Sequence, residues 1–433
     1  MCSVTVTVEQ PTFEHHRAAL GIGESCPRIS WRTSGPAGWT QAAYELRVDD
    51  DTYEPVISAE GVLVSWPGVA LGSRQSASVC VRVTGTDGSV SPWSPAADVE
   101  TGLLRPEDWA ARPVGAPWAE DADSDDRVPP LVRRAFTVRE GLAHARLYAT
   151  AHGLYEVEID GQRVGDDAMS PGWTSYQHRL RYYTYDVTGL LRPGDNTIGA
   201  WLGDGWYRGR MGWNGGFRNL FGSDLSLIAQ LELTYADGSV DVVATDASWR
   251  AATGPIMRTG NYDGEVYDAR LERPGWSSPG FDDAAWEPVA VGERDPATLV
   301  APQGPPVRCT QEAAPVAEWT PPPVPDASWQ DQEIGSNTPF QPPPAGTSGE
   351  NKTLAIVSLV VGILSLFCCG WFIPGIAAIV TGFMARSKAT QNPNEYGGAG
   401  LALGGIITGA FSIVLGIIVV ILYFAGFLAS LAR

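Results

Sequence analysis

Apolar and polar residues alternate in short runs over the N-terminal part of the chain. The runs include SVTVTVE, PRISWRT, AAYELRVDD, GVLVSW and SVCVRVTG. Because successive side chains of a strand point to opposite faces, this alternation predicts antiparallel strands, roughly seven of them in a sandwich. Within VRVTGTDGSVSPWSP, the pair Asp87-Gly88 predicts a hairpin turn. We therefore expect a fibronectin-III-like β-sandwich over residues 1–104.

The same alternation returns over residues 131–300, again in short strands rich in aromatic residues. The expected strands are RRAFTV, HARLYATA, YEVEID, RLRYYTYDV, TIGAWLG, SLIAQLELTYA and VDVVAT. The pairs Asp160-Gly161 and Asp237-Gly238 predict hairpin turns between neighbouring strands. This pattern indicates a second, jelly-roll-like sandwich, so the predicted soluble part is an all-β tandem.

Three segments are expected to lie outside the two sandwiches. Residues 105–130 contain the acidic, proline-containing stretch AEDADSDDRVPP, which predicts a solvated connector. Residues 320–352 hold three proline clusters and almost no aliphatic side chains, so we expect a disordered tether. Residues 301–319 lie between the second sandwich and this tether.

The C-terminal part is strongly apolar. It has no charged residue from Leu354 to Met384 and none from Leu401 to Ala432. Each stretch exceeds the roughly 20 apolar residues that cross the hydrocarbon of a bilayer, and neither offers a polar face to water. The sequence therefore predicts a two-helix transmembrane hairpin, with a first helix over 353–385, a loop over 386–398 and a second helix over 399–430.

Small residues and a proline modify this prediction. Gly370 and Pro374 are expected to kink the first, overlong helix. In the second helix, Gly404 follows Gly400 by one helical turn and Gly405 begins a similar pair, a spacing that permits close helix packing. Glycine as mere composition is the alternative.

Charge excludes one class of partner and leaves the membrane orientation open. The net charge of -19 lies almost wholly in the β-part, which argues against nucleic acid because phosphates attract clusters of Lys and Arg. Arg386 and Lys388 in the loop balance Lys352 and Arg433 on the outer flanks, so the positive-inside rule gives a tie. The N-terminus lacks the features of a signal peptide. We expect a multi-pass membrane protein with two spans and cytoplasmic β-domains.

Candidate binding chemistry is concentrated in aromatic-rich loops. The chain has 16 Trp and 14 Tyr residues, and the stretch LGDGWYRGRMGWNGGFRN combines rings with both signs of charge in a Gly-rich loop. Flat rings suit the C–H faces of sugars, and the polar groups suit hydroxyls. The alternative is that these rings plug one end of the sandwich. The sugar-binding candidates are Asp204, Trp206, Tyr207, Arg208, Trp213, Asn214 and, from a later segment, Tyr262.

That later segment, GNYDGEVYDARLE, also contains two candidate metal ligands. Period-two spacing places Asp263 and Glu265 on one face of a strand, where their hard oxygens suit calcium. Solvated turn carboxylates near Arg270 are the alternative. No other cofactor is indicated, since the chain has neither a His-x-x-x-His pair, a Gly-x-Ser-x-Gly elbow nor a phosphate-binding Gly-Lys-Ser/Thr motif.

Several long segments resemble a known enzyme family. They are LGIGESCPRISWRT, DGSVSPWSPAADVETGLL, the stretch from ARLYATAHGLYEVEID to LGDGWYRG, and YDGEVYDARLERPGWSSPGFDDAAWEPV. Together they are similar to the N-terminal domains of bacterial α-L-rhamnosidases, glycoside hydrolase family 78, over about residues 11–319. The resemblance implies a fibronectin-like domain, a jelly-roll domain and, at 301–319, the truncated start of the next family domain.

The resemblance also implies what activity to expect. In the family, catalytic acids belong to a downstream (α/α)₆ barrel whose acidic motif has no counterpart here, so we expect no catalytic residue in this chain. The C-terminal part resembles domain of unknown function 4190. The leading hypothesis is a membrane-anchored, non-catalytic carbohydrate-recognition protein for L-rhamnosyl groups. The alternatives are the accessory part of a split α-L-rhamnosidase with a separate catalytic chain, and a small membrane protein fused to a rhamnosidase remnant.

Overall fold

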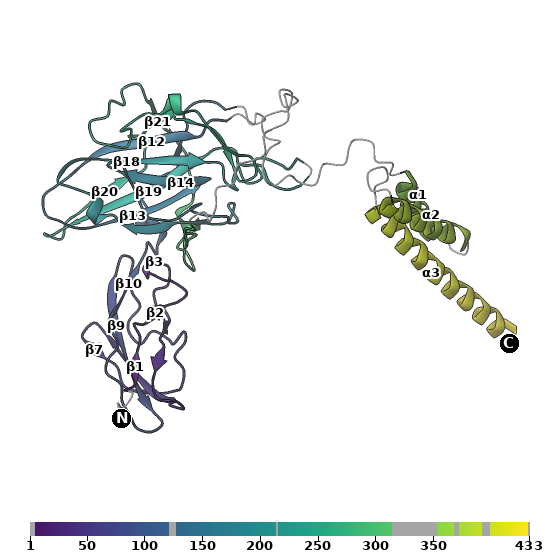
Figure 1. Ribbon diagram of the computed structural model, residues 1–433, viewed down its shortest axis with the longest axis horizontal. Helices are drawn as coiled ribbons and strands as arrows, with labels where there is room; N and C mark the ends of the chain where they lie inside the picture. The colour runs from purple at the N-terminus through teal and green to yellow at the C-terminus, as the bar shows by residue number, and fades with distance from the viewer. Residues whose placement is uncertain are drawn as a thin grey trace. The chain divides into compact units, whose positions relative to one another are not determined.

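The chain forms two compact units, Met1–Glu318 and Trp319–Arg433. The computed structural model describes residues 5–120, 127–213, 215–313, 353–367, 372–391 and 399–431. The first unit consists of β-strands and the second of helices (Figure 1). The Pro-rich tether expected over 320–352 lies outside the described residues.

The first β-domain is a sandwich built on one six-stranded sheet. Its order is β3-β10-β9-β6-β7, with β8 added beside β6, and the pairs β1-β5 and β2-β4 complete the domain. The strands are β1 (Thr7–Val8), β2 (Thr12–Phe13), β3 (Leu20–Ile22), β4 (Ile29–Ser30), β5 (Thr33–Ser34), β6 (Gln41–Val48), β7 (Asp51–Thr52), β8 (Val56–Ile57), β9 (Ser76–Gly85) and β10 (Ala97–Thr101).

Alternation explains the long strands of this domain. In β9, Val79, Val81 and Val83 are buried in the core, as period-two side-chain placement requires. The predicted hairpin turn after β9 is present, with Gly88 at φ +80°. The strand expected at GVLVSW is wrong, because Val64 makes only an isolated bridge to Ile29. The β-sandwich prediction itself is confirmed.

The second β-domain stacks two larger sheets. One has the order β17-β13-β19-β11-β25 with β20 beside β19, and the other has the order β15-β14-β18-β12-β21-β24. Their strands are β11 (Val114–Gly115), β12 (Pro130–Val138), β13 (Leu142–His152), β14 (Leu154–Ile159), β15 (Gln162–Arg163), β17 (Tyr183–Asp186), β18 (Gly194–Gly203), β19 (Ser226–Tyr235), β20 (Val240–Ala244), β21 (Arg250–Thr253), β24 (Glu287–Pro288) and β25 (Ala290–Val291).

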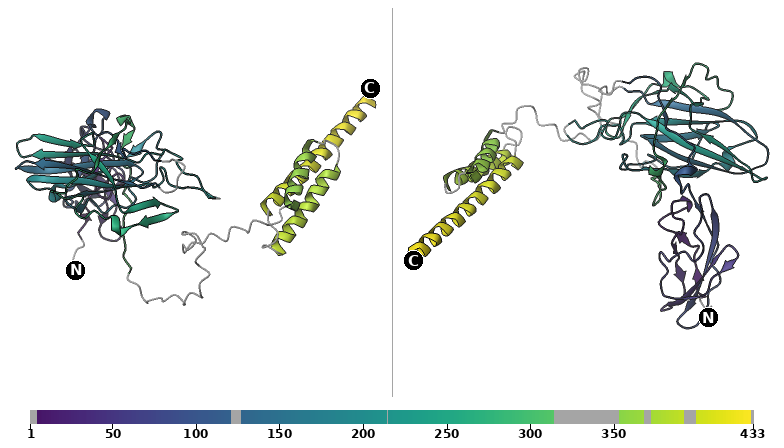
Figure 2. Two further views of the ribbon diagram at one scale, coloured as in Figure 1. Left: turned by 90° about the horizontal axis from the view of Figure 1, so that it is seen from above. Right: turned by 180° about the vertical axis from the view of Figure 1, so that it is seen from behind.

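A single apolar core joins these two sheets. Leu147 and Leu231 from the first sheet pack with Val157 and Ile198 from the second, and Trp249 lies in the same cluster. Two short pairs lie beside the sandwich: the parallel pair of β16 (Leu180–Arg181) with β26 (Leu299–Val300), and the hairpin of β22 (Ile256–Gly260) with β23 (Gly264–Tyr267). The views in Figures 1 and 2 show the layered strands of this domain.

Two segments expected outside the domains are instead part of the fold. Residues 105–130 contribute β11 to the sheet β17-β13-β19-β11-β25 of the second domain. Trp109 from this segment is buried against Tyr182. Of residues 301–319, the described part continues from β26 along the second domain, where Arg308 forms ion pairs with Asp166 and Asp167. It therefore packs on the second sandwich rather than beginning another domain.

Ion pairs also fix the two β-domains to each other. Arg74 of the first domain donates to Glu232 of β19 at 2.6 Å and to Asp108 at 2.8 Å. Tyr182 donates its hydroxyl to the Leu103 carbonyl at 3.1 Å. Cys26 and Cys80, which share the first domain, are free thiols. Polar contacts thus join two domains that were predicted from the sequence as separate sandwiches.

The C-terminal unit contains three helices that pack on one another: α1 (Thr353–Phe367), α2 (Phe372–Gln391) and α3 (Ala399–Leu431). The prediction of one helix over 353–385 is wrong, since α1 and α2 are separate. Gly370 lies outside the described residues, and Pro374 falls in the first turn of α2, where a proline is tolerated. Residues 386–391, expected in the loop, extend α2. Among the described residues, no helix combines the length and hydropathy needed to cross a membrane.

Candidate functional site

A long loop joins β18 to β19 and carries most of the predicted site residues. It begins after Gly203 and ends before Ser226. The chain turns sharply at Gly205, where φ is +52° and a Cβ would lie 2.6 Å from Leu154 Cγ, so that only glycine fits. This turn directs the following residues, including Tyr207, back over the end of the second sandwich.

A buried ion pair braces the start of this loop. Arg208 is fully buried, and its Nε donates to Asp204 Oδ1 at 2.6 Å while its Nη1 donates to Glu120 Oε2 at 2.5 Å. Burial raises the pKa of Asp204 above its usual range, and the charge of Arg208 opposes that rise. Asp204 and Arg208 were predicted as sugar ligands. In the structure they bind each other, and Arg208 binds Glu120, so their main role is to hold the loop in place.

A cavity of about 560 Å³ lies against this braced loop. It falls within the roughly 300–1,000 Å³ usual for small-molecule sites. The rings of Tyr207 and His152 stack at one side of it, with their centroids 4.9 Å apart and their planes 20° apart. Further lining groups with chemical character are Trp118, Glu120, Arg208 and Asp224. The cavity thus combines ring faces with acceptors and a donor.

His152 is held in one tautomer within this wall. Its Nε2 lies 2.9 Å from Arg294 Nη1, which can only donate, so Nε2 accepts. Nδ1 then carries the proton and donates to Ser226 Oγ at 2.8 Å. Burial, helped by the Arg294 charge, lowers the pKa of His152 from 6.5 to about 4. The imidazole is therefore neutral at physiological pH.

A second feature is an exposed aromatic surface formed by Trp213, Phe217 and Tyr262. Trp213 and Phe217 belong to the long loop and are 89% and 69% exposed. Tyr262, at the tip of the β22–β23 hairpin, is 60% exposed. Rings of this size normally lose water contact on folding, so these exposed examples make a candidate binding surface.

A charged clamp joins the loop to the hairpin. Asp263 accepts from Arg210 Nε at 2.8 Å through Oδ1 and from Arg218 Nη2 at 2.7 Å through Oδ2. Although burial alone raises the pKa of Asp263, hydrogen bonds and ion pairing with Arg210 and Arg218 hold it below its usual range. The two arginines come from the long loop, so the clamp fixes the aromatic surface.

This clamp bears on the expected calcium ligands. Both carboxylate oxygens of Asp263 already accept from guanidinium groups, and Glu265 is an exposed residue of β23. In the parts of the chain that the structure describes, no three His, Cys, Asp or Glu side chains gather in a way that suits a metal ion. The donor set at Asp263 and Glu265 thus fits an ion pair better than a bound cation.

The remaining predicted residues have different positions. Trp206 is half-buried and packs against a core cluster that includes Tyr148 and Tyr182, which is the plugging role left open as an alternative. Asn214 lies outside the described residues. The structure therefore brings Tyr207 and Arg208 to the cavity, with Asp204 behind them as the partner of Arg208, and leaves Trp213 and Tyr262 exposed on the aromatic surface.

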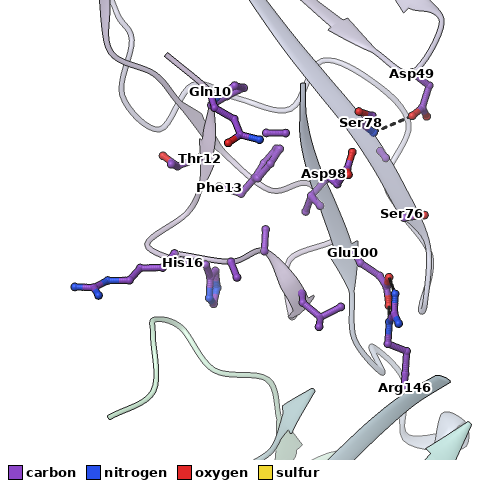
Figure 3. A pocket seen from close by; sticks show the side chains of 18 residues that line it. Gln10, Thr12, Phe13, His16, Asp49, Ser76, Ser78, Asp98, Glu100 and Arg146 are labelled. Carbon is purple, nitrogen blue, oxygen red and sulfur yellow. Dashed lines mark hydrogen bonds and ion pairs between the residues drawn. The ribbon is translucent and has the colours of Figure 1, made fainter. Parts of the chain in front are cut away.

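Another cavity, of about 640 Å³, lies along the first β-domain (Figure 3). Its charged groups are tied to one another, because Arg146 donates to Glu100 at 2.8 and 2.9 Å and Asp49 accepts from the Ser78 backbone at 2.8 Å. Phe13, which also lines it, is buried in the domain core. His16 also lines this cavity, and its buried Nε2 has no partner among the described residues.

Most cavity residues, including His152 and Glu120, were not among those predicted from the sequence. His152 was expected to be an ordinary surface or packing histidine, and its partners Ser226 and Arg294 are 74 and 142 residues away along the chain. Glu120 falls in a stretch expected to be solvated, yet it binds Arg208 from 88 residues away. Local sequence carries no signal of such distant pairings.

Two β-sandwich domains joined by ion pairs, with ring-bearing loops on the second, define an all-β tandem. Three family models match the chain. They are "Rha78A-like, N-terminal immunoglobulin domain" over residues 8–105, "Alpha-L-rhamnosidase N-terminal domain" over 140–311 and "Domain of unknown function (DUF4190)" over 354–419. The chain is therefore similar to the α-L-rhamnosidase N-terminal domain families over its β-unit and to DUF4190 over its helices, and the predicted resemblance is confirmed.

Known relatives extend well beyond this chain. An α-L-rhamnosidase of Formosa agariphila is 37% identical over 297 residues, which are 64% of this chain and 32% of the relative. The structure of the Aspergillus terreus α-L-rhamnosidase is 46% identical with a TM-score of 0.68, covering 70% of this chain and 36% of that one. The structure of the Streptomyces avermitilis enzyme with L-rhamnose is 26% identical with a TM-score of 0.66. That match covers 71% of this chain and 47% of the other. The chain thus spans about a third of the length of its curated relatives.

Proposed function

We propose that the β-unit is a non-catalytic carbohydrate-recognition region that binds L-rhamnosyl groups, and that the helical unit holds it at a membrane. The observation that carries the first part is the exposed aromatic surface of Trp213, Phe217 and Tyr262. Asp263 joins the long loop to the hairpin through Arg210 and Arg218, so the backbone segments that carry these rings are tied together before any ligand arrives.

The ligand class is supported by the relatives. The Streptomyces avermitilis enzyme was solved with L-rhamnose, and its aligned region shares this fold. A deoxy sugar such as rhamnose presents a methyl group and C–H faces that suit aromatic rings, while its hydroxyls suit arginine and carboxylate groups.

The absence of catalysis is supported by the chemistry of the site. Glycoside hydrolysis needs two carboxyl groups about 5–9.5 Å apart, one of them able to give a proton. Around the long loop, Asp263 is engaged by two arginines and Asp204 by Arg208, so neither is free to act on a glycosidic oxygen. We therefore expect no turnover from this chain alone.

Calorimetry on the full chain in detergent micelles tests the recognition proposal. L-Rhamnose and a rhamnosyl oligosaccharide are titrated with and without calcium, which also tests the calcium ligation expected from the sequence at Asp263 and Glu265. Trp213→Ala and Tyr262→Ala are expected to weaken oligosaccharide binding about tenfold, the factor set by roughly 1.4 kcal/mol of lost stacking. Ile57→Ala is the matched control, because Ile57 is 90% exposed on the first domain. Absence of heat under every condition would refute recognition.

The membrane proposal is supported by the way α1, α2 and α3 pack. Small residues face the interior, where Ser358, Ala378 and Ala402 are fully buried. Large apolar side chains face outward, with Phe383 and Phe411 60% and 62% exposed. A water-soluble bundle has the reverse distribution, whereas helices in lipid pack through small residues and present large apolar ones to the acyl chains.

Extraction tests the membrane proposal. The chain is expected to stay with the membrane pellet after an alkaline carbonate wash and to be released by detergent, whereas release by carbonate alone would contradict lipid embedding. Protease treatment of right-side-out and inverted vesicles then tests the proposed cytoplasmic position of the β-domains, which should be cleaved only in inverted vesicles.

The relatives' greater length favours one second candidate, the accessory part of a split α-L-rhamnosidase. Here the exposed aromatic surface would contact a separate catalytic chain instead of a glycan. Hydrolysis of p-nitrophenyl rhamnoside is measured for the chain alone, for the product of the neighbouring gene alone, and for both. Activity that requires both proteins would favour this candidate over simple recognition.

A further inference from the structure

The joint between the two β-domains is held by side-chain contacts and close packing. The chain crosses this joint once, after β10, and among the described strands no sheet has members from both domains. A Cβ at Gly21 of β3 would collide with the Thr184 side chain of β17, so the two domains approach closely here. The Leu103 backbone amide donates to the Tyr182 hydroxyl at 2.9 Å across the joint. Without a shared sheet, the joint can open while each domain stays folded.

His16 lies at this joint, on the loop that leads from β2 to β3. It lines a small cavity of about 110 Å³ together with Asp167, Tyr185 and Arg308 of the second domain. It also borders the groove of Figure 3, to which the second domain contributes Arg146. His16 is 8% exposed, and its Nε2 atom has essentially no solvent-accessible area and no hydrogen-bond partner among the described residues. The imidazole is thus buried where the domains meet.

The loop that carries His16 disfavours a positive charge on its ring. The one carboxylate close by on this loop, Glu14, is bound by Arg28, whose Nη2 lies 2.5 Å from Glu14 Oε2. His15 and Arg17, which flank His16 in the chain, are exposed and basic. Burial lowers the pKa of His16, while the charge of Glu14 opposes this shift and His15 adds to it.

Groups that face His16 from other elements are also engaged, exposed or neutral. Asp167 accepts from Arg308 Nε at 3.2 Å, and Glu100 accepts from Arg146 Nε at 2.8 Å. The other acidic side chains that line the two cavities are those of two exposed aspartates and two neutral phenols, Asp49, Asp98, Tyr183 and Tyr185. A protonated His16 in the closed joint would therefore be a buried cation whose nearest buried carboxylates already bind arginines.

We propose that His16 is a pH-sensitive switch between the two β-domains: the joint is closed while the imidazole is neutral, and protonation of His16 favours an open joint in which the ring meets water. In water the pKa of the ring returns towards the ordinary value of 6.5, so the open joint binds the proton more tightly and acid favours opening. Between pH 7.5 and pH 5.5 the ratio of open to closed joints rises by up to about tenfold. This switch is independent of the proposed function.

Hydrogen exchange tests the switch in the full chain in micelles, with rates corrected for the pH dependence of intrinsic exchange. The reporter is a peptide that contains Leu103, whose amide bonds across the joint, and the reference is β19 in the core of the second domain. From pH 7.5 to pH 5.5, protection of the reporter relative to β19 is expected to fall by up to about tenfold. In His16→Gln it should stay constant, because glutamine does not titrate. His15→Gln, a matched change at the exposed neighbour, should respond as the unaltered chain does.

One other group at the joint acts in the opposite direction. Glu24 follows Gly23, which packs near Ala301 of the second domain, and burial is the main cause that raises the pKa of Glu24, so its protonation favours closure. Because Glu24 is present in every variant, the difference between the unaltered chain and His16→Gln isolates His16. If His16→Gln loses the protection of β19, His16→Leu replaces it. Constant protection of the reporter in the unaltered chain, or an equal fall with and without His16, would overturn the proposal.

Discussion

Replacing His152 by glutamine is expected to reduce the loss of stability that the second β-domain suffers on acidification. His152 is held neutral in the folded chain, with its pKa lowered from 6.5 to about 4 chiefly by burial. A tenfold change in proton affinity corresponds to about 1.4 kcal/mol. Full protonation of His152 in the unfolded state alone therefore lowers the free energy of unfolding by roughly 3 kcal/mol. The Gln side chain keeps an acceptor for Arg294 but does not titrate.

The direction follows from which state binds the proton. Above pH 6.5 neither state carries the proton on His152, and its contribution to stability is complete. As the pH falls from 6.5 towards 4, the unfolded chain becomes protonated while the folded chain does not, so the free energy of unfolding falls. Between about pH 7.5 and about pH 4.5 this single residue accounts for a loss of roughly 2.5 kcal/mol.

Urea unfolding of the full chain in micelles, followed by tryptophan fluorescence, measures this effect at both pH values. The difference between the unaltered chain and His152→Gln should change by roughly 2.5 kcal/mol between them. His178→Gln is the control, because His178 is an exposed histidine of the same domain. If His152→Gln and the unaltered chain lose stability in parallel, His152 is not held neutral by the fold and the reasoning is refuted.

Two further substitutions test packing and charge in the second domain. Gly199→Ala should destabilise it by about 1–3 kcal/mol, because a Cβ there would lie 2.4 Å from the Trp276 ring, whereas Gly203→Ala in the same strand meets nothing closer than 3.5 Å and should be mild. Equal thermal unfolding of the two variants would contradict this. Arg208→Met should cost about 3–5 kcal/mol in urea unfolding by removing the hydrogen-bonded partner of buried Asp204 and leaving it only the 3.9 Å contact with Arg218. A loss below about 1 kcal/mol would show that Asp204 does not depend on Arg208.

The structure explains why the predicted site divided into two. In sequence, Trp213 and Arg208 belong to one loop and looked like one site. The fold turns the loop at Gly205, so that Arg208 is drawn inward to Glu120 while Trp213 stays in solvent. Which side of a loop meets the core depends on where distant strands end, and the loop's own residues do not encode that.

The sequence by itself determined the elements whose pattern is local. Alternation with period two specified β9 and β19, the Asp-Gly pairs specified their turns, and long apolar runs specified the C-terminal helices. It also carried the family resemblance, because that resemblance was read from contiguous segments of the chain.

Only the tertiary structure decided the contacts between residues far apart in the chain. The Asp263 clamp joins positions 45 and 53 residues apart, and the cavity wall depends on His152 meeting Arg294. β11 likewise enters its sheet from a stretch that looked solvated. Such pairings depend on the order of strands in the sheets and on which residues the whole domain buries. The residues that flank a carboxylate in the sequence do not indicate which arginine will pair with it.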